Sequence, residues 1–243
     1  MSSNKKRLYE YYSRQIKEPY ESTKMLLSFI SEHNIVKDGN TILDIGCGAG
    51  AVTHCLARHY NNVNWVGLDY NRDIIDIGKN ILRENNLGNL KLDYADWFNL
   101  PESEIGRYNG IINIHTLCCF KDCKDALLKL TDLKPQWIFI KSLFYDGPLD
   151  VLIHIRNYVT KNRNDGPDGD FNIFSLPRVE SIFKDAGYHF FLVMPFNIDI
   201  DLPKSSDGGR RTYTIRLGDN SRAQFSGPVY LPWYFILASK KPV

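Results

Sequence analysis

Short apolar runs alternate with longer amphipathic segments over residues 8–145 of the chain. Each apolar run has the length of a buried strand, and the longer segments repeat their apolar residues at helical spacing. The pattern predicts strands at residues 41–45, 63–69, 90–94, 108–114 and 136–142, and helices at residues 8–33, 50–60, 71–85 and 122–133. Strands that alternate with helices form a parallel sheet covered on both faces, so the predicted fold is a doubly wound α/β sheet.

The last third of the chain departs from this alternation of strands and helices. The pattern predicts helices at residues 148–161 and 176–187, a polar loop at 162–170, and strands at 189–195 and 233–239. The connection of residues 197–232 is too long for a bare link between two strands in a compact domain. It contains the segments TYTIRLG and RAQFSGPVY, separated by the turn residues Gly218, Asp219 and Asn220. This arrangement predicts an inserted β-hairpin near the C-terminus.

The composition is that of an ordinary globular protein, so we expect a single domain over residues 1–243. Hydrophobic residues make up 43% of the 243 residues and charged residues 24%. The net charge of +2 gives no reason to expect a nucleic-acid or membrane partner. No apolar run reaches the roughly 18 residues of a membrane helix. The segment MSSNKKRLYEYY lacks the apolar core of a signal peptide, so we expect a cytoplasmic protein.

The five cysteines give no pattern of a disulfide framework or a structural zinc site. Their number is odd, and no CxxC pair is present. We therefore expect no metal in this protein. Cys119 and Cys123 have the i, i+4 spacing of a helix, and we interpret them as small buried side chains, with metal or redox use as the alternative.

The segment TILDIGCGAG, residues 41–50, places a carboxylate just before a glycine turn. Gly46, Gly48 and Ala51 fit the dinucleotide-binding pattern loosely, and such turns usually bind phosphate. Asp44 would repel a pyrophosphate. S-adenosylmethionine has no phosphate and carries an ammonium that Asp44 could attract, directly or through water. This residue therefore favours S-adenosylmethionine over a nicotinamide dinucleotide, which a dehydrogenase would bind.

LDIGCGAG resembles the first signature of the class I S-adenosylmethionine-dependent methyltransferases, D/E-x-G-x-G-x-G. Asp44, Gly46, Gly48 and Gly50 fill its four fixed positions, and Cys47 lies within the cofactor-binding turn. The resemblance covers about residues 35–145 and a closing strand near 233–239. It implies a mostly parallel seven-stranded sheet with an antiparallel last strand, and S-adenosylmethionine as the cofactor.

Two further segments resemble signatures of this family. Asp69 ends the second strand, where the family carries an acid that binds the ribose diol; a helix N-cap is the other interpretation. Tyr70 follows it and could pack on the adenine. In DYADWFNLP, Asp96 and Trp97 match the acid and apolar residue that contact the adenine. A turn acid and a core tryptophan are the alternative for these two.

The fourth predicted strand ends in NIHTLCCF. In the family this edge lies beside the methionine part of the cofactor, which implies a polar contact for Asn113. His115 follows at the carboxyl end of the strand, where its side chain could act as a general base near neutral pH; a structural role is the alternative. The [DNS]-PP-[YFW] motif of enzymes that methylate nucleobase amino groups is absent here, which lowers the expectation of a nucleic-acid substrate.

Residues 1–35 are expected to form a helical cover over the cofactor-binding core of residues 36–145. Tyr11, Tyr12 and Tyr20 are candidates for closing the cofactor pocket, with core packing as the alternative.

The remaining part, residues 146–243, is expected to lie on the acceptor side. Its inserted hairpin at 197–232 would form one wall of the acceptor pocket, where Arg210 and Arg211 would suit an anionic acceptor.

The sequence thus predicts methyl transfer to a small polar molecule, as O-methylation of a sugar or metabolite hydroxyl. Aromatic and hydrogen-bonding residues in the predicted acceptor region favour such a substrate. The alternatives are a protein or RNA methyltransferase, a non-catalytic S-adenosylmethionine-binding module, and a nicotinamide dehydrogenase. The sequence leaves open whether the protein is a monomer or a homodimer.

Overall fold

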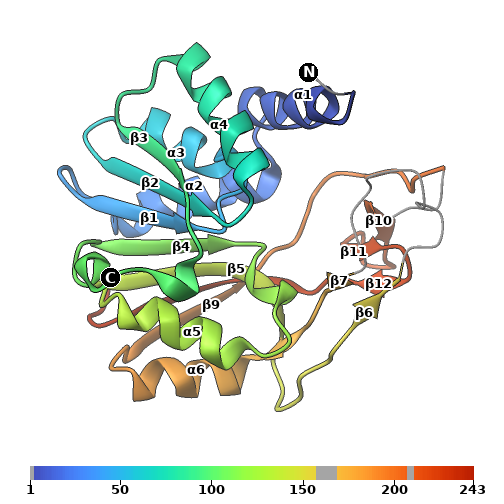
Figure 1. The fold of residues 1–243 in the computed structure, drawn as a ribbon. Coiled ribbons are helices and arrows are strands. Elements are labelled where there is room, and N and C mark those ends of the chain that lie inside the picture. The colour runs from blue at the N-terminus through green and yellow to red at the C-terminus, as the bar shows by residue number, and fades with distance from the viewer. Residues whose placement is uncertain (1–2, 157–168, 207–210) are drawn as a thin grey trace.

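The computed structural model describes residues 3–156, 169–206 and 211–243 (Figure 1). Its main strands are β1 (Thr41–Ile45), β2 (Asn64–Asp69), β3 (Leu90–Tyr94), β4 (Gly110–Ile114), β5 (Trp137–Tyr145), β9 (Phe190–Pro195) and β13 (Trp233–Ser239). They form one sheet in the order β3-β2-β1-β4-β5-β13-β9, and the short β8 (Phe174–Ser175) pairs parallel with the end of β5. Strands β1 to β5 are parallel, and β13 runs antiparallel to both of its neighbours. The predicted doubly wound sheet with an antiparallel last strand is confirmed.

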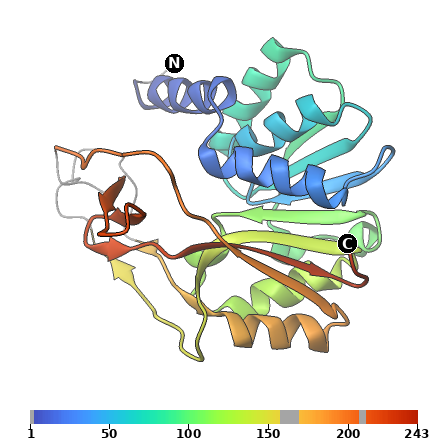
Figure 2. The ribbon, with the colours of Figure 1, turned by 180° about the vertical axis from the view of Figure 1, so that it is seen from behind.

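Within the described residues, six α-helices accompany the sheet: α1 (Ser3–Lys17), α2 (Glu21–His33), α3 (Ala51–His59), α4 (Arg72–Asn85), α5 (Cys123–Asp132) and α6 (Leu176–Asp185). The strand residues alternate between two apolar layers, as a period of two requires. Ile42 of β1 packs in the layer that contains α2 and α3, whereas the adjacent Leu43 packs in the layer that contains α5 and α6. Figures 1 and 2 show α5 and α6 on the side of the sheet away from α3 and α4. None of the helices described is long and apolar enough to span a membrane.

The helix predicted over residues 8–33 is two helices, so the expectation of one continuous helix was wrong. The chain breaks between α1 and α2 at residues 18–20, which contain Pro19. Proline lacks the N–H that a helix interior needs and disfavours helical geometry in the residue before it. The break lets α1 turn away from α2 and pack Ile16 against Ile77 and Ile81 of α4.

The helix predicted at residues 148–161 is also wrong over its described part. Val151 forms an antiparallel bridge with Ile173, and β6 (His154–Ile155) pairs with β7 (Gly169–Asp170). The side chain of Asn172 accepts the Ile153 N–H at 2.8 Å and holds the two segments together. Pairing with a distant segment therefore overrides the local helical pattern. The end of the predicted helix and most of the predicted polar loop fall on residues 157–168, which lie outside the described part of the chain.

The predicted hairpin is present in the insertion. β10 (Thr212–Arg216) pairs antiparallel with β11 (Arg222–Ser226) across a turn in which Asn220 has a φ of 65°. A third strand that the sequence did not predict, β12 (Val229–Tyr230), pairs with β11. In Figures 1 and 2 this small sheet stands beside the end of the central sheet at which β5 finishes and β13 begins.

Candidate active site

The glycine turn joins the end of β1 to the start of α3 in a backbone conformation that glycine favours. Gly46, Gly48 and Gly50 have φ angles of 74°, 57° and 77°. A Cβ atom on Gly46 would lie 2.2 Å from the Oγ1 atom of Thr116, so any side chain there would collide. The turn therefore packs closely against Thr116 at the carboxyl edge of the sheet, the edge at which doubly wound proteins bind ligands.

Asp44 lies beneath this turn, buried to 1% exposure, with one unpaired oxygen. Its Oδ2 atom accepts a hydrogen bond from the Thr53 hydroxyl, while Oδ1 has no partner among the described residues. Burial raises the pKa of Asp44 from 3.8 to about 7, although the hydrogen bond from Thr53 opposes the shift. A buried acceptor without a donor is costly, so a donor-bearing cation would relieve this site. The adjacent Cys47 is a thiol because burial raises its pKa well above the usual value.

Asn113 provides a second unpaired oxygen at the end of β4, the strand next to β1. Its Nδ2 donates to the Ile45 carbonyl at 2.8 Å, but Oδ1 is buried and has no partner within the described residues. Two buried acceptors at the ends of adjacent strands fit an ammonium, which carries three donors. This geometry supports the predicted contacts of Asp44 and Asn113 with the amino-acid end of S-adenosylmethionine, and these contacts stay predictions.

Asp69 ties the end of β2 to the glycine turn. One carboxylate oxygen accepts the Gly48 N–H at 2.9 Å, and the other accepts the Asn71 N–H at 2.8 Å. Asn71 itself caps α4 by accepting the Ile74 N–H. Each oxygen of Asp69 keeps a lone pair for a further donor. Its geometry is therefore compatible with the predicted ribose contact, which stays a prediction.

The residues predicted to contact adenine divide into exposed and buried ones. Tyr70 is 73% exposed beside Asp69, where its ring is free to cover a ligand. Asp96 is exposed and caps the short helix η1 (Trp97–Asn99) by accepting the Phe98 N–H. Trp97 is only 8% exposed and packs against Phe98 and Phe120. The adenine contacts of all three stay predictions, and the placement of Trp97 also fits its alternative role as a core residue.

His115 follows β4 with a φ of 63°, an uncommon conformation for a residue with a side chain. Its Nε2 atom is hydrogen-bonded to the Lys141 side chain, and its ring centroid lies 4.7 Å from that of Trp233. Protein surrounds the imidazole on these sides, while the residue keeps an exposed face toward a pocket. The protein groups that pack around the imidazole and keep water from it, together with the nearby Lys141 amine, hold the pKa of His115 well below its usual value. The imidazole is therefore neutral at pH 7 and has a nitrogen lone pair.

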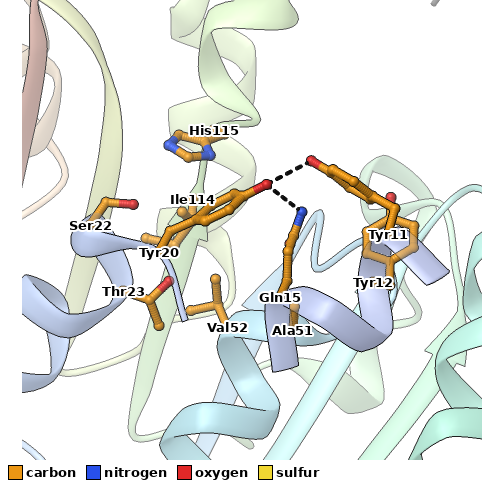
Figure 3. Close-up of a pocket in the computed structure, with 10 residues that line it drawn as sticks. All are labelled: Tyr11, Tyr12, Gln15, Tyr20, Ser22, Thr23, Ala51, Val52, Ile114 and His115. Atoms are coloured by element: carbon orange, nitrogen blue, oxygen red, sulfur yellow. Dashed lines mark hydrogen bonds between the residues drawn. The ribbon is translucent and has the colours of Figure 1, made fainter. Parts of the chain in front are cut away.

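This pocket of about 140 Å³ lies between the N-terminal helices, the start of α3 and the exit of β4 (Figure 3). Its lining is Tyr11, Tyr12, Gln15, Tyr20, Ser22, Thr23, Ala51, Val52, Ile114 and His115. All three tyrosines predicted to close the site are in the lining. The Tyr20 hydroxyl accepts a hydrogen bond from Gln15 at 2.9 Å and donates one to the Tyr11 hydroxyl at 3.2 Å. Since ligand pockets usually measure about 300–1,000 Å³, this one would hold only part of a cofactor or acceptor.

Sequence reasoning missed Lys141. Its only signal was a lysine within the apolar strand sequence WIFIKSLFY, where a charged side chain is unusual. None of the described residues of the insertion is in the pocket lining, so its role as a wall stays a prediction. Arg210 lies outside the described residues, and the expected anionic acceptor also stays a prediction.

Comparisons with known proteins find methyltransferases. A family model described as "Methyltransferase domain" matches residues 36–165, just over half of the chain. EEF1A lysine methyltransferase 2 of Mus musculus is 26% identical over 199 residues, covering 80% of this chain and 68% of that protein. Release factor glutamine methyltransferase of Aliivibrio fischeri is 28% identical over 95 residues, 39% of this chain and a third (33%) of that enzyme. The N-terminal domain of EvdMO1 with SAH bound has a TM-score of 0.60 at 14% identity, covering 90% of this chain and 81% of that one.

Proposed function

The chain belongs to the S-adenosylmethionine-dependent methyltransferases, and we propose that it methylates an uncharged hydroxyl group of a small polar molecule. The observation that carries this proposal is the pocket in front of His115. Tyrosine hydroxyls, an amide and a neutral imidazole line it, and no acidic side chain is among the described residues that do so. These groups can hydrogen-bond a polar acceptor but offer no counter-charge to a cationic one.

The residues at the edge of the sheet fit the cofactor. Asp44 and Asn113 would hold its ammonium with their unpaired oxygens, and Asp69 would hold its ribose hydroxyls. When bound there, S-adenosylmethionine supplies a methyl group on a sulfonium, which is a good leaving group. The chain's own contribution is then alignment of the acceptor and exclusion of water. Tyr12 of α1, whose hydroxyl would lie 3.7 Å from a Cβ atom on Gly48, would help to exclude water at the glycine turn.

His115 provides the proton acceptor that a hydroxyl needs. A hydroxyl is a poor nucleophile until its proton is removed, and a neutral imidazole within hydrogen-bond reach can take that proton. Tyr20 and Tyr11 form a chain of hydroxyl groups in the same pocket and would orient a polar acceptor.

A second candidate is methylation of a protein side chain. It is favoured by the similarity to EEF1A lysine methyltransferase 2 of Mus musculus, which extends over 80% of this chain. The pocket argues against a lysine acceptor, because its ammonium would approach the amine of Lys141 behind His115 without a carboxylate in the lining to balance the charge.

The test is transfer of the labelled methyl group of S-adenosylmethionine to two kinds of acceptor. One panel holds sugars, phenols and hydroxy acids, and the other holds lysine peptides and a protein extract. We expect label in hydroxyl-bearing molecules, and a loss of about 10²–10⁴-fold in turnover for His115→Gln with little change in SAH affinity. His189→Gln, at an exposed histidine of the chain, is the matched control. Label found only in the peptides or proteins would overturn the proposal in favour of the second candidate.

A further inference from the structure

Lys141 is a lysine buried in the centre of the sheet. It belongs to β5, between β4 and β13, and is 2% exposed. Its Nζ atom lies 4.5 Å from the ring centroid of Trp233, 4.6 Å from that of Phe196 and 5.9 Å from that of Phe235. Within the described part of the chain, the Nζ atom of Lys141 forms no ion pair, and its one hydrogen-bond partner is Nε2 of His115. A buried amine without a carboxylate is costly, which makes a purely structural role a poor explanation.

The groups around the Lys141 amine place its pKa near neutral pH. The titratable groups that face it are His115 at the exit of β4 and Cys118 in the short helix η3 (Leu117–Cys119). From β13 and from the residue after β9 the contacts are aromatic, and their ring faces favour the ammonium form. Burial lowers the pKa of Lys141 to about 7, against the opposing influence of Cys118. Both the amine and the ammonium are therefore accessible at neutral pH.

The protonation state of Lys141 decides which nitrogen of His115 carries the proton. An ammonium has only donors, so it can pair with Nε2 only if that nitrogen is bare; the neutral imidazole then carries its proton on Nδ1. A neutral amine can accept, so Nε2 can then carry the proton and Nδ1 becomes bare. Nδ1 has no hydrogen-bond partner among the described residues, and the imidazole projects toward the pocket beside Tyr20 (Figure 3).

We propose that Lys141 is a positioning residue that acts through His115 by switching its tautomer. As a neutral amine, Lys141 accepts the Nε2 proton and leaves Nδ1 free to take a proton from the acceptor. As an ammonium, Lys141 donates to Nε2 and converts Nδ1 into a hydrogen-bond donor. The pair thus has a base form and a donor form, and the base form is the one that activates a hydroxyl.

The inference rests on the proposed function in one step, the removal of the hydroxyl proton. That proton moves to Nδ1, the Nε2 proton moves to the Lys141 amine, and the imidazole stays neutral throughout. The proton released by methylation of a hydroxyl is therefore held as a lysine ammonium against the rings of Trp233 and Phe196. It returns to solvent through His115 by the same two transfers in reverse.

The test is nitrogen NMR of the full chain labelled with ¹⁵N-histidine, in the absence of any acceptor. The two ring nitrogens have different shifts when protonated and bare, and His115→Gln assigns the His115 signals. We expect the Nε2–H tautomer at pH 8.5 and the Nδ1–H tautomer at pH 6, with the change centred near pH 7 and no imidazolium formed over that range. A His115 that keeps one tautomer from pH 5.5 to 9 would overturn the inference.

Variants separate the switch from a structural role of the lysine. Lys141→Met should abolish the change near pH 7, whereas Lys91→Met, at an exposed lysine of β3, should leave it intact. Lys141→Arg, whose guanidinium stays charged, should hold His115 in the Nδ1–H form at every pH. If Lys141→Met fails to fold, the wild-type titration and the arginine variant still test the switch.

The same experiments distinguish failure of the switch from failure of the proposed function. If the tautomer changes near pH 7 while only protein acceptors are methylated, the proposed function is wrong and the switch stands. If hydroxyl acceptors are methylated while the tautomer stays fixed, the proposed function stands and the switch is wrong.

Discussion

The buried carboxyl of Asp44 predicts a dependence of stability on pH that a single substitution should remove. Its pKa is raised from 3.8 to about 7 in the folded chain, mainly by burial, so folding favours the protonated form. A group with a raised folded pKa destabilises the fold as pH increases from the unfolded value to the folded value. A shift of about three pKa units destabilises the folded chain by about 4 kcal/mol, and this full effect is reached above pH 7.

The comparison is between the wild type and Asp44→Asn without cofactor. Asparagine keeps the size and the hydrogen bond from Thr53 but cannot ionise. The free energy of unfolding of the variant, relative to that of the wild type, should increase by about 2–3 kcal/mol between pH 5 and pH 8. Urea unfolding followed by circular dichroism at each pH measures this difference.

The sign of the pH dependence makes the test decisive. An ordinary paired carboxylate has a lowered pKa. With such a carboxylate, the free energy of unfolding of the wild type would increase relative to that of the variant as pH rises, which is the opposite trend. Asp38→Asn, at an exposed position, controls for the general loss of one acid. If the free energy of unfolding of the variant, relative to that of the wild type, stays constant or decreases between pH 5 and pH 8, Asp44 is not a buried acceptor that lacks a donor.

Four other outcomes are expected. Because binding of an ammonium requires ionised Asp44, calorimetry should show SAH affinity rising about fivefold from pH 6 to pH 7, and no such rise in Asp44→Asn. Asp69→Ala should weaken SAH binding by about 2–3 kcal/mol in the same assay, since it removes charge-assisted hydrogen bonds and also the contact that holds the glycine turn. Gly46→Ala should lower the free energy of unfolding by about 2–4 kcal/mol in urea, because φ is positive and the new Cβ would lie 2.2 Å from a side-chain oxygen; Gly88→Ala, with open space around it, should change little. Replacing residues 204–226 by a short glycine linker should preserve SAH binding and abolish acceptor turnover in the label-transfer assay; full turnover would make the insertion a cap on the sheet edge.

Local patterns determined several strands and the glycine turn. The strands predicted at 41–45, 90–94 and 233–239 agree with β1, β3 and β13, because a buried strand is visible as a compact apolar run. Gly46 was predictable for a similar reason, since the turn that it occupies requires glycine whatever surrounds it. The break at Pro19 is also a local effect, because proline disrupts a helix interior in any surroundings, although the apolar spacing of residues 8–33 masks it.

Tertiary structure decided what depends on residues far apart in the chain. The helix expected at 148–161 gave way to pairing with residues 169–173, because backbone hydrogen bonds between distant segments outweigh a weak local preference. The pairing of His115 with Lys141 against Trp233 exists only because β4, β5 and β13 are neighbours in the sheet. A pKa depends on burial and on nearby charges, which a linear pattern does not carry. The sequence by itself therefore determined the fold and the kind of cofactor, whereas the protonation chemistry of the site arose from packing three distant segments into one low-dielectric environment.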